Sequence, residues 1–597
     1  MRQVIYDLET NGLLKATEDK PRYTRVWCLA LCDAEDPSAE VEVYHDFPEA
    51  CCRRDGSLRE GYSIVSAAQR RIGYNSLAYD DQVLEREGNT PVGEALDLLV
   101  ENRLHWPDIK SIDKKRKAVP SRLKGSHSLE AWGYRLHKHK GDFNDYSKFS
   151  PEMVDYCIGD VETTRAVYKN IQRQGWTDLP SRIEHDFARN VLGLHRVGVG
   201  FDYLAAGQLR DPLEAARKAQ VAVVQDILGP RKIWRLTPGG KIPRLRKNQF
   251  RAWPLNLNAP QQIVAKLKEK YNWRPDPKDR TESGLDGFTE KVIKKLPKEW
   301  PVTEPLLAYQ QAKQAIGKLY QGEKALMKHA VPVGPEEYRI YHEPIHNGTH
   351  THRMQHRVVS NIPKPGTRWG HEFRSLFVPR RGWVMVGCDM AGIQARIIGH
   401  FLYPYDKGSY IDKLINGDIH QDNADAMGVP RDDAKNVLYA TLFNAKPPKI
   451  ASMLGCSKRD AEEAQQKLFK NLTGLQSLIQ DLQEQAGKRG VLLGPDGRLI
   501  RVRNAWDALV SKVQAWEAVI FKVATNDVCS TLAAERGKLW NLTILYHDEY
   551  NGEAESSFAE TLASEMAAAI TRAGEFFKLH CPLEGEAKIG KSWRDVH

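Results

Sequence analysis

The segment LTILYHDEYNGE at 542–553 constrains the chain most, because it sets two adjacent acidic residues between short apolar runs. Ile544–Tyr546 is a predicted strand and Asn551–Gly552 is expected to close the return, so Asp548 and Glu549 should lie at or beside a hairpin tip. Two carboxylates held this close repel each other, and a bound cation relieves the repulsion. Taken alone, so short an acidic triplet is most often a solvated turn, so other segments must decide its role.

A second acidic position lies in RGWVMVGCDMAGIQAR at 381–396, where the apolar run Val384–Cys388 stops at Asp389. A buried strand that ends this way delivers a carboxylate to the rim of a sheet. Asp389 and Asp548 could then share two metal ions that stabilise the attacking and leaving oxygens of an in-line phosphoryl transfer. Mg²⁺ suits such a site, because it binds carboxylates together with substrate phosphates. The alternative is that Asp389 only caps the helix that follows.

The third segment is RDDAKNVLYATLF at 431–443, in which cations and rings recur every four residues. On a helix this spacing places two cations and two rings along one face, and Pro447–Pro448 is expected to end that helix. The cations can hold a triphosphate and the rings can stack on a base. The alternative is a helix with its rings in the core and its cations in water. The four residues are Arg431, Lys435, Tyr439 and Phe443.

In their order along the chain, the segments at 381–396, 431–443 and 542–553 resemble motifs A, B and C of the family A, DNA polymerase I-like enzymes. They are most similar to the replicative polymerases of short-tailed bacteriophages. The resemblance spans nearly the whole chain. It is supported by SHSLEAWGYRL at 126–136, NGDIH at 416–420, DGRLIRVR at 496–503 and the ending GKSWRDVH.

The N-terminal third contains a second acidic set. Asp7 and Glu9 are two residues apart on a predicted strand and so share a face, Asp80 stands where a loop enters a helix, and Tyr156 precedes Asp160 by one helical turn. In this order they resemble the three motifs of DnaQ-like 3′→5′ proofreading exonucleases. The resemblance implies that the four carboxylates hold two Mg²⁺ ions and that the tyrosine orients the attacking water. Because none of these positions is replaced, the exonuclease is expected to be active.

The resemblance implies an α/β multidomain fold. A ribonuclease H-like (DnaQ-like) exonuclease domain would be followed by a right-hand polymerase with a helical thumb, an antiparallel-sheet palm and helical fingers. The implied boundaries are 1–180 for the exonuclease, 181–335 for the thumb, 336–400 and 525–597 for the palm, and 401–524 for the fingers.

It also assigns roles to individual residues. Arg353 and Gln514 would read the minor groove at the primer terminus, where correct base pairs look nearly alike, and His547 would touch the primer strand. His420 would join Arg431 and Lys435 on the incoming phosphates while Tyr439 stacks on the nucleotide. Asp389 and Asp548 would hold two Mg²⁺ ions, and Glu549 would support this metal site without binding the ions directly.

Several positions depart from the family pattern. Gln394 stands where relatives usually carry Glu, and Phe443 where they carry Tyr, which implies weaker exclusion of a ribose 2′-hydroxyl. Tyr439, where some relatives carry Phe, implies easy chain termination by dideoxynucleotides. His352 and Asn444 replace glycines and are expected to add side chains near the nascent pair. An unusual template, such as DNA containing 2-aminoadenine, is one interpretation, and compensated drift is the other.

Composition agrees with this class. The chain has 597 residues, 41% of them hydrophobic, and a formal charge of +10, the sign expected for a partner made of phosphates. No apolar stretch approaches the roughly 18 residues of a membrane span, and the first residues enter a predicted strand, so a cytoplasmic protein is expected, in the host cell if phage-encoded. The nine cysteines do not follow zinc-ligand spacing.

The predicted function is template-directed DNA synthesis on a primer, with proofreading, for phage replication. The expected partners are primer-template DNA and deoxynucleoside triphosphates. A monomer is expected, without a thioredoxin clamp, because the sequence between Trp234 and Asn258 is too short for the insertion that recruits one in some relatives. Two alternatives remain: a single-subunit RNA polymerase, and a DNA-repair nuclease or binding protein whose polymerase half has decayed.

Overall fold

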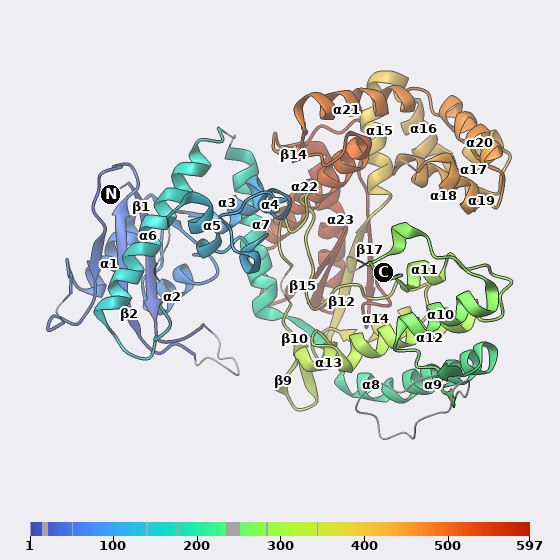
Figure 1. The fold of residues 1–597 in the computed structure, drawn as a ribbon. Coiled ribbons are helices and arrows are strands. Elements are labelled where there is room, and N and C mark those ends of the chain that lie inside the picture. The colour runs from blue at the N-terminus through green and yellow to red at the C-terminus, as the bar shows by residue number, and fades with distance from the viewer. Residues whose placement is uncertain are drawn as a thin grey trace. The chain divides into compact units, whose positions relative to one another are not determined.

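The chain divides into two compact units, which are described separately. A computed structural model describes residues 2–14, 22–50, 52–138, 141, 143–175, 178–233, 251–281, 284–342, 344–443 and 445–597, with the side chains of 231–233 and 251 excluded. The first unit comprises Met1–Val197, Glu343–His356 and Val386–Ile589, and the second Gly198–His342, Arg357–Met385 and Gly590–His597 (Figure 1).

The first unit begins with a five-stranded sheet in the order β3-β2-β1-β4-β5. The central strand β1 pairs antiparallel with β2 and parallel with β4, so the sheet is mixed. Its strands are β1 (Gln3–Thr10), β2 (Val26–Asp33), β3 (Glu42–Tyr44), β4 (Arg70–Gly73) and β5 (Glu94–Asp97).

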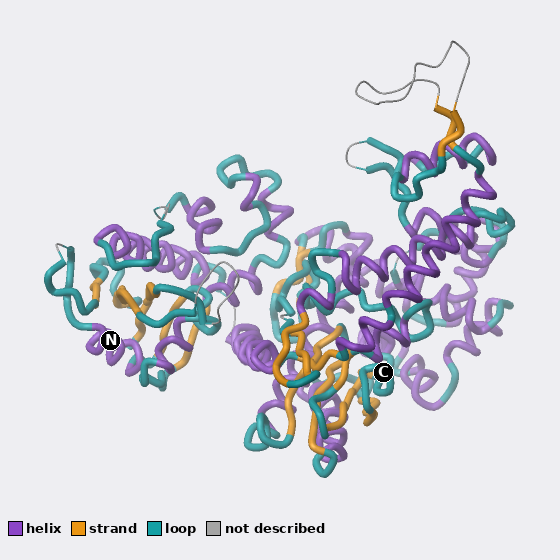
Figure 2. Tube along the Cα trace, turned by 90° about the horizontal axis from the view of Figure 1, so that it is seen from below, coloured by secondary structure: helices purple, strands orange, loops and turns teal. Residues whose placement is uncertain are grey.

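Helices cover both faces of this sheet, as Figure 2 shows. The sequence VWCLALCD of β2 is apolar at every position but the last, and its alternate residues enter two different cores. Cys28 and Ala30 pack on the side of α6, whereas Leu29 and Leu31 pack on the side of α1. The helices of this region are α1 (Leu58–Ala67), α2 (Asp80–Arg86), α3 (Leu98–His105), α4 (Ile109–Asp113), α5 (Leu129–Leu136), α6 (Pro151–Gln172) and α7 (Asp178–Val197).

A second, four-stranded sheet has the order β15-β16-β12-β17. β15 and β16 form an antiparallel hairpin in which Tyr546 faces Glu549. The turn therefore consists of His547 and Asp548 themselves, and the prediction that Asn551–Gly552 closes the return is wrong, because these residues pair inside β16. The strands are β12 (Trp383–Met390), β15 (Trp540–Tyr546), β16 (Glu549–Glu555) and β17 (Gly585–Gly590), and the long helices α22 (Ala508–Thr531) and α23 (Ala559–Phe576) pack on each other.

The chain between β12 and α22 is mainly helical. Helix α18 ends at Leu442, and Pro447–Pro448 open the next helix rather than ending this one, because proline fits the first turn of a helix, where its missing N–H costs nothing. The elements are α15 (Ile393–Asp406), α16 (Ser409–Asn416), α17 (Ile419–Met427), α18 (Arg431–Leu442), α19 (Pro447–Leu454), α20 (Lys458–Asn471) and α21 (Leu475–Arg489), followed by the hairpin of β13 (Val491–Leu493) and β14 (Leu499–Arg501).

The second unit combines a small sheet with a helical pair. The sheet has the order β11-β6-β10-β9, and α9 packs along α12. Asp202 caps α8 by accepting a hydrogen bond from the backbone N–H of Ala205. The elements are β6 (Val199–Phe201), α8 (Tyr203–Gln208), α9 (Arg210–Leu228), β7 (Arg231–Ile233), β8 (Arg251–Trp253), α10 (Pro260–Tyr271), α11 (Glu290–Ile293), α12 (Thr303–Ile316), α13 (Leu326–His329), β9 (Ala330–Gly334), β10 (Glu337–Ile340), α14 (Gly370–Ser375) and β11 (Phe377–Val378).

A buried ionic network ties distant segments of the first unit together. The carboxylate of Glu184, in α7, accepts hydrogen bonds of 2.6 Å from Arg498 and from Lys522, and all three side chains are buried. Lys522, in α22, also donates to the side chain of Asn347 at 2.7 Å and to the carbonyl of His352 at 3.1 Å. Burial alone would raise the pKa of Glu184, but Lys522 and then Arg498 outweigh it and lower that pKa to about 2.

We predict that Glu184→Gln lowers the free energy of unfolding of this unit by about 3 kcal/mol, because two cations stay buried without their shared anion. The matched control is Asp186→Asn, on the same helix, whose exposed pair with Arg189 should contribute little. Thermal denaturation of both variants against wild type measures the difference. Because the pKa of Glu184 in the folded state lies below its unfolded value of about 4.3, the charged carboxylate stabilises the fold above that pH. The stability difference between wild type and Glu184→Gln should therefore shrink as the pH falls toward 2. Equal melting temperatures for the two variants at neutral pH would contradict it.

Candidate active sites

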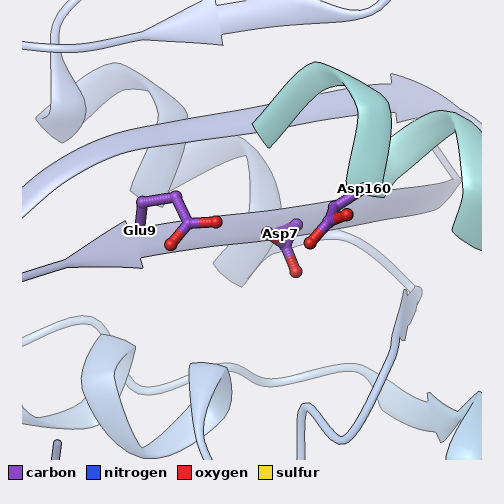
Figure 3. Close-up of side chains that lie close together, drawn as sticks. All are labelled: Asp7, Glu9 and Asp160. Carbon is purple, nitrogen blue, oxygen red and sulfur yellow. The ribbon is translucent and has the colours of Figure 1, made fainter. Parts of the chain in front are cut away.

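Three carboxylates meet on one face of the N-terminal sheet. Asp7 and Glu9 alternate along β1 on the face that also carries Ile5, which packs in the core beneath α6. Asp160 projects from α6 onto this face, and one oxygen of each of the three carboxylates lies within 4.8 Å of the others (Figure 3). Three carboxylates this close repel one another without a cation, and their hard oxygen ligands suit Mg²⁺.

The structure separates the two adjacent aspartates at the start of α2. Asp80 is buried, and its pKa is raised well above the usual range by burial and then by the charge of Asp7. It therefore stands next to the acidic cluster, although it is not among the three carboxylates within 4.8 Å of one another. Asp81 turns elsewhere, accepting hydrogen bonds of 3.1 Å from Arg71 and 2.6 Å from Tyr6.

Tyr156 lies one turn before Asp160 on α6. Its pKa is raised by burial first and then by the charges of Asp160 and Glu9, which places the phenol beside the cluster. A raised pKa keeps the hydroxyl protonated at neutral pH, so it can donate a hydrogen bond to a water or a phosphate there.

The second acidic site lies where β12 meets the tip of the β15–β16 hairpin. Asp389 is the next-to-last residue of β12, and Asp548 is in the turn between β15 and β16. The backbone N–H of Met390 donates to the carbonyl of Asp548 at 3.2 Å, so the two aspartates stand on adjoining segments. Burial, followed by the charges of Asp389 and Glu549, raises the pKa of Cys388 to about 12.

Sequence reasoning missed an acidic residue at this site, Glu517. This residue lies on α22, is buried, and its side chain accepts hydrogen bonds from Arg353 and, at 2.7 Å, from Gln394. Burial raises its pKa, Arg353 lowers it, and the charge of Asp548 raises it further. Its only sequence signal is an acidic residue inside the long apolar helix ALVSKVQAWEAVIFKVA, which does not reveal its partners.

The residues predicted to contact the primer lie close to Glu517 and Asp548. Gln514 is half-buried and precedes Glu517 by three residues on α22. Arg353 and His547 both line a small cavity of about 10 Å³, together with His356 and Lys522. This volume is about that of one water molecule, so the cavity is a packing gap rather than a binding pocket.

The predicted phosphate-binding residues lie together on α17 and α18. Arg431 and Lys435 are exposed, and Arg431 forms an ion pair of 2.8 Å with Asp418. The rings of His420 and Tyr439 are 6.1 Å apart. Burial, then the charges of Lys435 and Arg431, lowers the pKa of His420.

The other two predicted positions on this segment follow α18. Phe443 follows the last residue of the helix and is 43% exposed, so its ring is accessible as the prediction requires. Asn444 lies outside the described residues.

His352 is one of the positions that depart from the family pattern. Its side chain is fully buried, and its ring makes hydrogen bonds to Asn347 at 3.3 Å and to the carbonyl of Leu499 at 3.4 Å. Its φ of +60° lies in the left-handed region, which explains why relatives carry glycine here. The ring therefore points into the protein interior rather than toward solvent.

The N-terminal region is an α/β domain. It is followed by a four-stranded sheet with the long helices α22 and α23, a mainly helical stretch between β12 and α22, and an acidic hairpin tip. Together these features define the fold of a right-hand polymerase. A solved structure of the POL domain of Pol1 from M. smegmatis, in complex with a DNA primer-template and dNTP, has the same fold. It matches with a TM-score of 0.75 and 18% identity, covering 99% of this chain and 96% of that one.

Sequence comparisons give the family. The model of DNA polymerase family A matches residues 240–595. The DNA-directed DNA polymerases of Enterobacteria phage T3 and Escherichia phage T7 are each 24% identical to this chain, with 100% of both proteins covered. The thermostable DNA polymerase I of Thermus aquaticus is 26% identical over 59% of this chain and 44% of its own length.

The chain therefore belongs to DNA polymerase family A, and it is a DNA-directed DNA polymerase. This confirms the predicted fold class and polymerase function over the RNA polymerase alternative. Family A polymerases use divalent metal ions, and the carboxylates described above fit that requirement. Within the described parts of the chain, the membrane-span criterion of length and apolarity is met by none of the helices.

We predict that His420 strengthens triphosphate binding only when protonated. Its lowered pKa leaves the ring neutral at pH 7, and protonation below its ordinary value of 6.5 adds a positive charge beside Lys435. The KM for a deoxynucleoside triphosphate, as a ratio of wild type to His420→Gln, should therefore fall as the pH is lowered through that range. Steady-state kinetics from pH 8 to about pH 5 measures this ratio.

The exposed His371, on α14, supplies the control. His371→Gln should keep the wild-type pH profile. A ratio for His420→Gln that stays flat across the range would contradict the assigned role.

Proposed function

We propose that the chain extends a primer by adding deoxynucleotides at an acidic site formed by Asp389 and Asp548. The observation that carries this proposal is the backbone hydrogen bond of 3.2 Å between Met390 and Asp548, which seats the hairpin tip against the end of β12. The two carboxylates would hold two Mg²⁺ ions, which when bound lower the pKa of the primer 3′-hydroxyl and neutralise the triphosphate.

The surrounding side chains would position the two substrates. Arg431, Lys435 and His420 would bind the phosphates, and the partly buried ring of Tyr439 would stack on the nucleotide. Arg353, Gln514 and His547 would contact the primer end, and Glu549, buried at the start of β16, would support the aspartates from behind. Binding of the correct pair would order these groups before the primer hydroxyl attacks, so pair shape would control the rate.

We also propose a 3′→5′ proofreading activity in the N-terminal region. The cluster of Asp7, Glu9 and Asp160, with Asp80 beside it, would hold Mg²⁺, and Tyr156 would orient the attacking water. The domain boundaries proposed for these activities are 1–180 for the exonuclease, 181–335 for the thumb, 336–400 and 525–597 for the palm, and 401–524 for the fingers.

Two expectations about partners belong to this proposal. The polymerase would act as a monomer in the cytoplasm of a phage-infected host. It would also work without a thioredoxin clamp, because the sequence between Trp234 and Asn258 is too short for the insertion that some relatives carry; residues 234–250 of this segment lie outside the described residues. Product lengths on a primed single-stranded template should be the same with and without added thioredoxin.

We predict that the two activities can be removed one at a time. Asp389→Ala and Asp548→Ala should each lower primer extension by at least about a thousandfold, since the loss of one metal-binding carboxylate removes several kcal/mol of transition-state stabilisation. Both variants should still degrade the primer when nucleotides are omitted. Asp7→Ala and Asp160→Ala should have the opposite effect.

One gel assay on a labelled primer-template, with and without deoxynucleotides, separates the four variants from wild type. Glu162→Ala is the matched control for the exonuclease site, because Glu162 is an exposed acidic residue on α6, the helix that carries Asp160. If Asp389→Ala and Asp548→Ala both extend the primer at the wild-type rate, the proposed polymerase site is wrong.

A further prediction concerns Tyr439. Its hydroxyl should make dideoxynucleotides acceptable substrates, as in relatives with tyrosine at this position, and Tyr439→Phe should reduce their use relative to deoxynucleotides by at least about tenfold, or 1.4 kcal/mol. Single-nucleotide incorporation with each analogue measures this ratio. Phe443→Tyr, four residues along the same segment, is the control, since its added hydroxyl should affect ribonucleotides more than dideoxynucleotides.

A further inference from the structure

The carboxylate of Glu517 joins Arg353, which would contact the primer end, to Gln394, which the family resemblance places beside the sugar of the incoming nucleotide. Arg353 donates through one guanidinium nitrogen to both oxygens of Glu517, and the side-chain amide of Gln394 donates to one of them at 2.7 Å. The three residues come from three separate segments: the loop between β10 and α14, the first turn of α15, and the middle of α22. Glu517 accepts hydrogen bonds from both of the others.

Its burial makes this contact strong and directional. The side chain of Glu517 is 2% exposed and that of Arg353 is 25% exposed, so water screens their attraction weakly. A buried carboxylate without its partners costs several kcal/mol, so the arginine and the amide are held where the carboxylate places them. The side that Arg353 leaves exposed remains available to a substrate.

The same contact accounts for the departure at position 394. Relatives usually carry Glu there, whereas this chain carries Gln. A carboxylate at 394 would bring a second negative oxygen to 2.7 Å from Glu517, close to the charge of Asp548. An amide instead donates a hydrogen bond to Glu517. The acidic group that relatives carry on α15 thus stands on α22 in this chain.

We propose that Glu517 is a positioning residue that determines specificity at the polymerase site, because it holds Arg353 and Gln394 on one carboxylate. It thereby couples the contact with the primer terminus to the fit of the incoming sugar. The inference rests on the proposed function, in which Arg353 contacts the primer end, and on the family resemblance, which places Gln394 beside the sugar of the incoming nucleotide. A mispaired primer end that displaces Arg353 would disturb Gln394 through the shared carboxylate, and so slow the next addition.

A charge-swap cycle tests the coupling. Glu517→Gln keeps the shape but removes the anion that holds Arg353, and Gln394→Glu sets two carboxylates against each other. Each single change should lower kcat/KM for a matched primer by about tenfold, as expected for residues in one hydrogen-bonded network. The double variant Gln394→Glu with Glu517→Gln restores one carboxylate and one amide, so it should recover to within about threefold of wild type.

Selectivity separates positioning from a structural role. Glu517→Gln should reduce the preference for matched over mismatched primer ends and for deoxy- over ribonucleotides together, whereas a structural defect would slow all substrates equally. Melting temperatures of each variant, with Asp186→Asn as a surface control, report folding. The inference is overturned if the two single effects simply multiply in the double variant, or if both preferences stay at wild-type values.

Failure of the proposed function is visible separately. Asp389→Ala that extends a matched primer at the wild-type rate refutes the catalytic site. If Asp389→Ala loses primer extension as predicted, but the effects of Gln394→Glu and Glu517→Gln simply multiply in the double variant, only the role of Glu517 is refuted.

Discussion

Buried charge on helix α22 is the constraint on which the first unit depends. Glu517 and Lys522 lie in the middle of this helix, where the neighbouring residues are apolar, and both are almost completely buried. A buried charge is tolerated only when partners surround it, so each demands specific segments at a specific place. Lys522 recruits Glu184 of α7 and the loop at 347–352, and Glu517 recruits the next residue of that loop, Arg353. Burial lowers the pKa of Lys522 to about 8, although the charge of Glu184 opposes this shift.

The two acidic sites are built by different means. At the N-terminal site, alternation along β1 brings Asp7 and Glu9 to one face, and a single helix adds Asp160. At the proposed polymerase site, a strand end and a hairpin tip adjoin through one backbone hydrogen bond. The first design depends on local strand geometry and sheet cover, whereas the second depends on the pairing of β16 with β12 across a long stretch of sequence.

This difference explains what the sequence could predict. The strand at Asp7, the helical turn between Tyr156 and Asp160, and the end of β12 at Asp389 follow from local periodicity, and all three are present. The position of the hairpin turn was wrong by four residues, because Asn551–Gly552 resembles turn chemistry while the pairing of Tyr546 with Glu549 places the turn earlier. Tertiary pairing overrode a local turn preference at that point.

Partners that are distant in sequence account for what could not be predicted. Nothing local distinguishes Asp80 from Asp81, and only the position of Arg71 shows which one is neutralised. In the same way, Glu517 has no signal until Arg353 is placed against it.

The unusual residues of the chain have to be judged by such partners. His352 is strained in backbone but anchored by its ring in the interior, so its substitution for glycine is a matter of packing. Gln394 differs in kind, because its amide contacts a carboxylate that is itself bound to Arg353 beside the acidic hairpin tip. A change at His352 therefore alters only the support of a loop, while a change at Gln394 alters the electrostatics of the proposed site. Both are departures from one family pattern, and only their three-dimensional neighbours distinguish a structural substitution from one that shapes the chemistry.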